Sequence, residues 1–290
     1  MKKNCLAILV LILLLSNYLP AQRPEFKVPN GCQEKYFQTS DNVRLRYLVA
    51  GNGEALVFIP GWTMTAEIWE LQIEHFAKTN MVIVLDPRGQ GKSGQVTEGL
   101  YFEREARDVK ELVDHLKLPS YYLIGWSWAG PMLYYYGKLF DSPTLKGLIP
   151  VDPPFRISEP FLKWLAGMMK SLLHDRDRTT TEFARALFKA PVSDTYLRKV
   201  KEGCLMTSTT SAVTLLAVFF SYSDTEWIQL IKEINKPILF IGAEEEKDAL
   251  EQLNKEVKIN YVIVPGAGHT VFIDKPAEFN KIVKDFISRK

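Results

Sequence analysis

Short apolar runs alternate with amphipathic stretches along most of the chain. Mostly apolar runs rich in β-branched and aromatic residues are typical of buried strands, and they occupy residues 54–59, 81–85, 121–125, 145–151, 237–241 and 260–264. Helical periodicity follows at 66–78, 103–116, 131–140 and 276–288, and in a stretch that ends at Val257. This order predicts an α/β fold in which a mostly parallel sheet is flanked by helices.

The first strands have a different pattern. Residues 34–49 alternate apolar and polar positions, with the turn-forming Ser40-Asp41-Asn42 in the middle. Such a pattern predicts a β-hairpin, which we place at the antiparallel edge of the sheet. With the hairpin, the sheet has eight strands.

The alternation stops after residue 154. From 155 to about 235 the chain has helical periodicities and no convincing buried strand, with segments at 161–173, 180–188, 193–201, 211–220 and 226–234. We assign the last segment to the core. The expected organisation is therefore a core of residues 23–154 and 224–290 with a helical insertion at 155–223.

The N-terminus has the layout of a secretory signal peptide. Lys2 and Lys3 precede an uncharged apolar core from Cys5 to Leu15, and the small Ala21 follows. This core is short for a membrane span, which needs about 20 residues. We expect cleavage near Ala21, a signal peptide at 1–22, and an exported, periplasmic or extracellular protein without a stable membrane span. An uncleaved anchor is the alternative.

Charge and cysteine content exclude several classes of partner. The chain has 36 Lys and Arg against 34 Asp and Glu, and loss of Lys2 and Lys3 leaves 34 of each. A net charge near zero gives no basic footprint for nucleic acid. Cys32 and Cys204 remain, as a disulfide or as two buried thiols, and no metal-ligand spacing occurs. We therefore expect a small-molecule substrate and no cofactor.

The candidate chemistry centres on Ser127. This residue lies between the apolar run that starts at Tyr121 and the helical segment that starts at Pro131, with the small Gly125 and Ala129 two positions away on either side. A serine on such a sharp strand-to-helix turn has a strained backbone, and small neighbours let strand and helix approach closely. The helix N-terminus behind it favours developing negative charge.

A second candidate is His269, in the loop Pro265-Gly266-Ala267-Gly268-His269 after the last strand. Loops at the carboxyl ends of strands carry the site in open α/β sheets. The other three histidines, His75, His115 and His174, lie on predicted helices or in a charge run. Gly91-Lys92-Ser93 is not a phosphate loop, because Asp86 and Pro87 occupy the start of the motif.

Four stretches together give a specific pattern: 59–62, 86–93, 125–130 and 266–269. With them, residues 35–290 resemble the α/β-hydrolase fold in its capped, peroxidase-and-esterase-like branch. Two positions depart from the family pattern. Ala129 replaces the last glycine of the turn, and Pro60 stands where many relatives have histidine.

The resemblance implies a serine hydrolase. Ser127 would be the nucleophile, His269 the base, and the backbone N–H groups of Trp62 and Trp128 the oxyanion donors. The insertion would be a cap over the strand ends, with apolar residues partly in its own core and partly in a pocket roof: Phe161, Trp164, Leu165, Met168, Met169, Phe219 and Phe220. Asp86 and Arg88 would be structural.

The acid of the triad is left open between two strand ends. In relatives it commonly stands three residues after the glycine that ends the strand, and counting from Gly242 gives Glu245. Asp152, at the end of the preceding strand, is the alternative acid, and Glu244 is one residue off register. Residues 244–246 could also be only a charged helix start.

The expected reaction is hydrolysis of an ester-type small molecule, such as a carboxylic ester or lactone, through an acyl-enzyme. A serine nucleophile argues against haloalkane dehalogenases and epoxide hydrolases, which use aspartate there. It does not separate esters from thioesters, amides or C–C bonds. The alternative from another class is a non-hydrolytic binding or sensing protein with the same fold.

Overall fold

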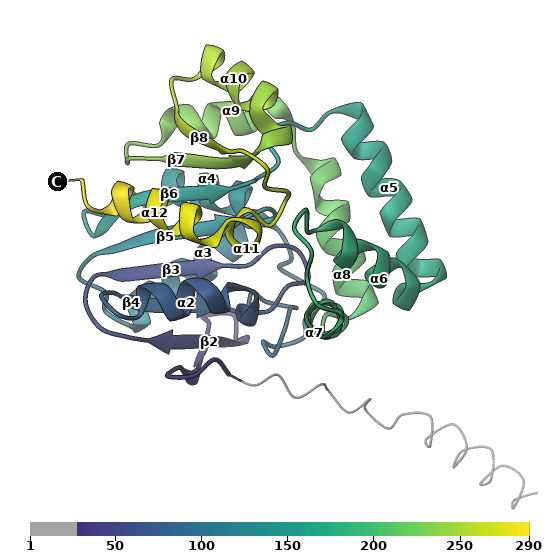
Figure 1. Cartoon of the computed structure of the whole chain (residues 1–290), viewed down its shortest axis with the longest axis horizontal. Coiled ribbons are helices and arrows are strands. Elements are labelled where there is room, and N and C mark those ends of the chain that lie inside the picture. The colour runs from purple at the N-terminus through teal and green to yellow at the C-terminus, as the bar shows by residue number, and fades with distance from the viewer. Residues whose placement is uncertain (1–27, 290) are drawn as a thin grey trace, which may run out of the picture.

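The computed structural model describes residues 28–289 and contains one mixed sheet of eight strands, which runs through the middle of the molecule (Figure 1). Their order is β1-β2-β4-β3-β5-β6-β7-β8. The strands are β1 (Gln33–Gln38), β2 (Arg44–Ala50), β3 (Ala55–Ile59), β4 (Met81–Leu85), β5 (Tyr121–Trp126), β6 (Leu145–Val151), β7 (Leu239–Ala243) and β8 (Asn260–Val264). The expected signal peptide lies outside the described residues.

The expected fold class is confirmed. β1 and β2 form the antiparallel hairpin, with Gln38 opposite Arg44, and β2 pairs antiparallel with β4. All pairs from β4 to β8 are parallel. Every residue of β3 and β5 is buried, because helices cover both faces of the parallel region. Such strands therefore read as continuous apolar runs in the sequence.

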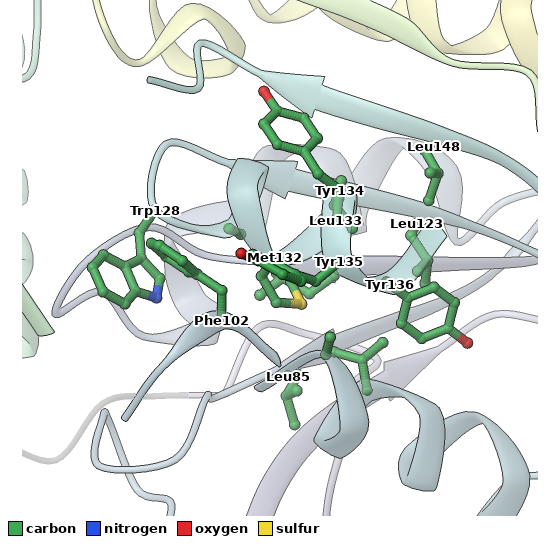
Figure 2. Close-up of a cluster of buried hydrophobic side chains, with 14 of the residues drawn as sticks. Leu85, Phe102, Leu123, Trp128, Met132, Leu133, Tyr134, Tyr135, Tyr136 and Leu148 are labelled. Atoms are coloured by element: carbon green, nitrogen blue, oxygen red, sulfur yellow. The ribbon is translucent and has the colours of Figure 1, made fainter. Parts of the chain in front are cut away.

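Helices form two layers on the sheet. One layer contains α2 (Glu70–Phe76), α11 (Val271–Asp274) and α12 (Pro276–Ile287), and the 3₁₀-helix η1 (Ala66–Trp69) precedes α2. The other contains α3 (Phe102–His115), α4 (Ala129–Leu139), α9 (Asp224–Glu233) and α10 (Lys247–Glu256). A hydrophobic core lies between this second layer and the sheet. Figure 2 shows part of it, where aromatic and aliphatic side chains around α4 pack closely.

The insertion consists of helices: α5 (Glu159–His174), α6 (Arg176–Ala186), α7 (Asp194–Leu205), α8 (Thr209–Ala217) and the 3₁₀-helix η2 (Val218–Ser221). They gather beside one end of the sheet (Figure 1). Side-chain oxygens of Ser158, Asp175, Ser193 and Ser208 cap the four α-helices. Such caps satisfy backbone N–H groups that have no partner inside the helix. With these caps, α5, α6 and α8 begin two to four residues earlier than expected, and α7 begins one residue later.

No single helix within residues 28–289 has the length and apolar composition needed to cross a membrane. The stretches Asp194–Leu205 and Thr209–Ser221 meet both criteria only as a pair, and that pair is bent by 82°.

Two local features were not predicted from the sequence. One is α11, which has only four residues. The other lies in the charge run after His174, where Arg176 is half-buried and donates to the carbonyl oxygen of Cys204 at 2.9 Å. Burial lowers the pKa of this guanidinium. Cys204 is itself a buried free thiol, as is the half-buried Cys32, so the two do not form a disulfide.

Candidate active site

Ser127 occupies a strained turn between β5 and α4. Its φ is +53°, in the left-handed region, and a non-glycine residue held there typically costs on the order of 1–3 kcal/mol. Its backbone N–H donates to the carbonyl oxygen of Val151 at 2.8 Å. A Cβ on Gly125 would lie 3.0 Å from the Cβ of Ala129. The small residues that flank Ser127 therefore let strand and helix meet, as the sequence predicted.

His269 links this serine to a carboxylate. Its Nε2 lies 2.9 Å from Ser127 Oγ and its Nδ1 lies 2.6 Å from Asp152 Oδ2. The loop that carries His269 is held in place through its backbone, because Trp126 Nε1 donates to the carbonyl oxygen of His269 at 2.8 Å. The neighbouring Gly268 N–H donates to an Asp274 carboxylate oxygen at 2.8 Å.

Asp152 is fixed through both of its oxygens. It follows β6, has a φ of +43° and is 6% exposed. Oδ1 accepts the backbone N–H of Ala243 at 2.7 Å, which leaves Oδ2 for His269. Such paired hydrogen bonds fix both the position and the orientation of a carboxylate.

The structure does not place Glu245 beside His269. Its side chain is 67% exposed and lies 3.3 Å from Lys189 Nζ, while Glu244 lies 3.4 Å from the same ammonium. The count from Gly242 assumed that this residue ends β7, but the strand continues to Ala243, and the carboxylate beside His269 follows β6 instead. The next three residues form the 3₁₀-helix η3 (Glu244–Glu246).

Trp62 and Trp128, the two expected oxyanion donors, line the same pocket as Ser127. In residues 28–289, the backbone N–H groups of Trp62 and Trp128 donate to no protein acceptor. Both indoles line the pocket and are anchored behind it: Trp62 Nε1 donates to Ala212 O at 2.9 Å and Trp128 Nε1 donates to Glu105 Oε2 at 2.7 Å. Both side chains are therefore part of the pocket wall and of the hydrophobic core.

Glu105 was missed by the sequence interpretation. It lies on α3 and is 4% exposed, and burial raises the pKa of its carboxyl to about 8. Phe102, on the same helix, packs against Trp128 with ring centroids 4.6 Å apart; Figure 2 shows these two side chains together. The amphipathic pattern of the helix gave no signal, because Glu105 reads as an ordinary acidic residue of a first helical turn.

A cavity of about 560 Å³ opens above Ser127. Side chains of the core form its floor and side chains of the insertion form its walls. Most of these are apolar and many are aromatic: Trp62, Trp126, Trp128, Phe155, Phe161, Trp164, Leu165, Phe183, Leu187, Leu216 and Phe219. Five polar or charged side chains reach it: Ser127, Asp152, Arg156, Glu246 and His269.

The loop after β4 has a structural role, as expected. Asp86 is fully buried, accepts the backbone N–H of Lys92 at 2.9 Å and lies 3.0 Å from an Arg46 nitrogen. Arg88 pairs with Asp108 at 2.6 Å. These internal contacts use the groups that a phosphate loop would direct toward a ligand.

No group of three or more His, Cys, Asp or Glu side chains in 28–289 could hold a metal ion. His115 stacks on Phe37 with ring centroids 5.6 Å apart, and His75 packs edge-on against Phe76. Neither touches the cavity.

Comparison with known proteins places this geometry in a family. A sequence profile described as "Alpha/beta hydrolase family" matches residues 56–282. The chain is 26% identical over 273 residues to a putative 2-succinyl-6-hydroxy-2,4-cyclohexadiene-1-carboxylate synthase of Bacillus subtilis, which covers 86% of this chain and 96% of that protein. It is 32% identical over 127 residues to a bifunctional esterase/perhydrolase of Acinetobacter calcoaceticus, covering 42% and 46%.

Solved structures show the same fold. A bromoperoxidase from Bacillus anthracis superposes with a TM-score of 0.81 at 20% identity, and an esterase from Exiguobacterium antarcticum with a TM-score of 0.80 at 16% identity. Each covers 89% of this chain and 100% of the other. With the profile match over most of the described residues, these findings show that the chain belongs to the alpha/beta hydrolase family.

Proposed function

We propose that this hydrolase is a serine hydrolase that cleaves an ester-type small molecule through an acyl-enzyme. One observation supports this most strongly: the unbroken series Ser127 Oγ, His269 Nε2 and Nδ1, and Asp152 Oδ2, with separations of 2.9 Å and 2.6 Å. A nucleophile within reach of a base, with the base oriented by a carboxylate, is the arrangement of nucleophilic acyl transfer. In this proposal the acid is Asp152 and not Glu245.

The first half of the reaction forms the acyl-enzyme. Ser127 Oγ attacks the substrate carbonyl carbon while His269 Nε2 takes its proton. The negative Asp152 keeps the Nδ1 proton on the ring and stabilises the imidazolium. The carbonyl oxygen becomes an oxyanion, which accepts hydrogen bonds from the N–H groups of Trp62 and Trp128. Loss of one such donor typically lowers kcat about 10²- to 10³-fold.

The second half releases the acid. His269 donates its proton to the leaving alcohol and then accepts one from water, which attacks the acyl-enzyme carbonyl. Collapse of the second tetrahedral species returns the proton to Ser127. The apolar walls support this sequence because electrostatic contacts are stronger where water is excluded. We assign this exclusion to residues 155–223, acting as a cap.

The cavity favours substrates with apolar parts on either side of the reacting carbonyl, such as carboxylic esters and lactones. The relative named as a bifunctional esterase/perhydrolase supports this choice. Thioesters, amides and C–C bonds use the same machinery and remain the alternatives within the hydrolase class.

A fluorophosphonate probe tests the proposal. Covalent labelling of the wild-type protein should require Ser127 and His269, so Ser127→Ala and His269→Ala should each abolish it while circular dichroism shows a folded chain. A panel of acyl and lactone substrates then measures turnover. If the wild-type protein is neither labelled nor active on the panel, the alternative of a non-hydrolytic binding or sensing protein replaces the enzyme.

We also propose that residues 1–22 are a signal peptide and that the protein is exported. The motivation is the basic start, the short apolar core and the small Ala21. Intact-mass analysis of protein collected outside the cytoplasm should give an N-terminus between Ala21 and Arg23. Detection of Met1 on that material would contradict cleavage.

A further inference from the structure

One charged side chain of the cavity has no partner within residues 28–289. Among the other polar side chains of the cavity, His269 contacts both Ser127 and Asp152. Glu246 also lines the cavity, is half-buried, and has no hydrogen bond or ion pair with another described residue. A carboxylate removed from water without a partner is unfavourable, so this position favours a ligand that supplies positive charge.

The fifth polar side chain, Arg156, does not supply that charge. It lies 3.8 Å from the Asp224 carboxylate and also pairs with Glu256. Its charge is therefore compensated from outside the cavity. An anionic substrate would have to share Arg156 with two carboxylates, whereas a cationic one would find Glu246 free.

The neighbours of Glu246 in η3 are occupied. Lys189 approaches both Glu244 and Glu245 at the surface, at 3.4 Å and 3.3 Å, and does not pair with Glu246. The three consecutive glutamates thus differ: two form exposed ion pairs and the third faces the pocket. This difference also provides a matched control, because Glu245→Gln removes the same charge outside the cavity.

Charged groups from several elements surround Glu246. Asp152 after β6 and Glu245 in η3 contribute negative charge near Glu246. His269 after β8 contributes positive charge when its ring is protonated. Burial, with a smaller contribution from Asp152, raises the pKa of the Glu246 carboxyl to about 7. Near neutral pH this carboxyl is therefore only partly ionised, and a bound cation would favour its ionised form.

The cavity walls suit the same ligand. Trp62, Trp126, Trp128 and Phe219 all line it, and the faces of aromatic rings attract ammonium groups electrostatically. We propose that Glu246 is a specificity-determining residue that receives a cationic group of the substrate, so that the enzyme prefers apolar esters carrying an ammonium group. This inference rests on the proposed ester hydrolysis.

Two pairs of matched esters test it, one for each side of the reacting carbonyl. Butyrylcholine and 3,3-dimethylbutyl butyrate differ only in a quaternary nitrogen or carbon of the alcohol. The p-nitrophenyl esters of 4-(trimethylammonio)butanoate and 5,5-dimethylhexanoate differ in the same way in the acyl group. In at least one pair, the wild-type kcat/KM should be roughly tenfold or more higher for the cation, as expected for a charge-assisted contact.

The variants assign this preference to a residue. Glu246→Gln should lower the kcat/KM ratio of cationic to neutral ester roughly tenfold, and Glu245→Gln should leave it within about twofold. The wild-type ratio should also fall as pH drops from 8.5 to 6, because Glu246 then gains a proton. Titration of the catalytic groups affects both esters of a pair and cancels in the ratio.

The results separate this inference from the proposed function. Hydrolysis of the neutral esters with no cation preference in either pair, or an equal loss in both glutamine variants, would overturn the role of Glu246 and leave ester hydrolysis intact. If no ester is cleaved, calorimetric titration with phenyltrimethylammonium tests directly whether the cavity binds a cation at Glu246. Binding weakened roughly tenfold by Glu246→Gln supports the cation site, and binding that is absent or unchanged in this variant contradicts it.

Discussion

The ends of β6 and β7 lie side by side in the sheet and both are followed by acidic residues, yet the two places differ in nearly every physical respect. Asp152 after β6 is buried, has a strained backbone and is fixed by the Ala243 N–H and by His269. Glu244 and Glu245 after β7 are exposed and share one lysine. The comparison shows that buried, directed hydrogen bonds distinguish a site carboxylate from surface acids; the number of acids does not.

The sharpest test of this comparison is to neutralise one acid at each strand end. Asp152→Asn should lower kcat by up to about 10⁴-fold, since the amide can stabilise the wrong tautomer of His269. Glu245→Gln should change kcat less than about twofold. Steady-state kinetics on one ester measure both. A collapse in the Glu245 variant with the Asp152 variant active would return the acid to the later strand.

A smaller effect should follow from replacing the backbone N–H that orients Asp152. Ala243 has a φ of −65°, which proline adopts, and its N–H donates to Asp152. Proline removes this donor and directs its ring Cδ toward the carboxylate, so Ala243→Pro should lower kcat at least about 10- to 100-fold, because a hydrogen bond to a charged group contributes about 1.5–3 kcal/mol.

The matched control for this variant is Ala243→Ser, which keeps the N–H. It should retain kcat within a few fold. Equal kcat values in the proline and serine variants, with both proteins folded by circular dichroism, would show that this hydrogen bond does not orient the acid.

Glu105 extends the comparison to a buried acid without a cationic hydrogen-bond partner. Because its pKa is raised to about 8 by burial, the folded protein keeps a proton that the unfolded chain loses near pH 4.5. This group therefore lowers stability as pH rises from about 4.5 to 8, and its effect is constant above that range.

Glu105→Gln should remove this pH-dependent loss, so the free energy of unfolding of the variant relative to wild type should rise by a few kcal/mol between pH 4.5 and 8. Urea denaturation at several pH values measures it, with the exposed Glu245→Gln as the control. A difference that stays constant across this range would mean that Glu105 is ionised in the folded protein.

The smallest effect is expected for the exposed glutamates after β7. Lys189→Ala removes both ion pairs to Glu244 and Glu245, and exposed pairs of this kind contribute little because solvent screens them. We expect the urea denaturation midpoints of variant and wild type to be nearly equal, and any difference should shrink further at 1 M salt. A large drop in the midpoint of the variant would mean that η3 depends on Lys189 for its position.

The sequence was sufficient wherever the determining pattern is local. The apolar runs predicted the strands of the parallel region. The residues around Ser127 and His269 predicted that these two side chains lie on loops at strand ends. It was insufficient where a side chain is defined by a distant partner. Ala243 and Asp152 are 91 residues apart, and the count that selected Glu245 depended on where β7 ends. Glu105 was missed for the same reason, because its hydrogen-bond partner Trp128 lies at the start of another helix.

The two tryptophans beside Ser127 belong to opposite sides of the sheet. The indole of Trp126 packs in the core with α11 and α12, whereas that of Trp128 packs in the core with α3 and α4. The serine is thus attached to both hydrophobic layers and cannot shift without disturbing one of them. Loss of activity on heating should therefore coincide with global unfolding and not precede it, so the enzyme should keep its full rate until the temperature at which the whole fold melts.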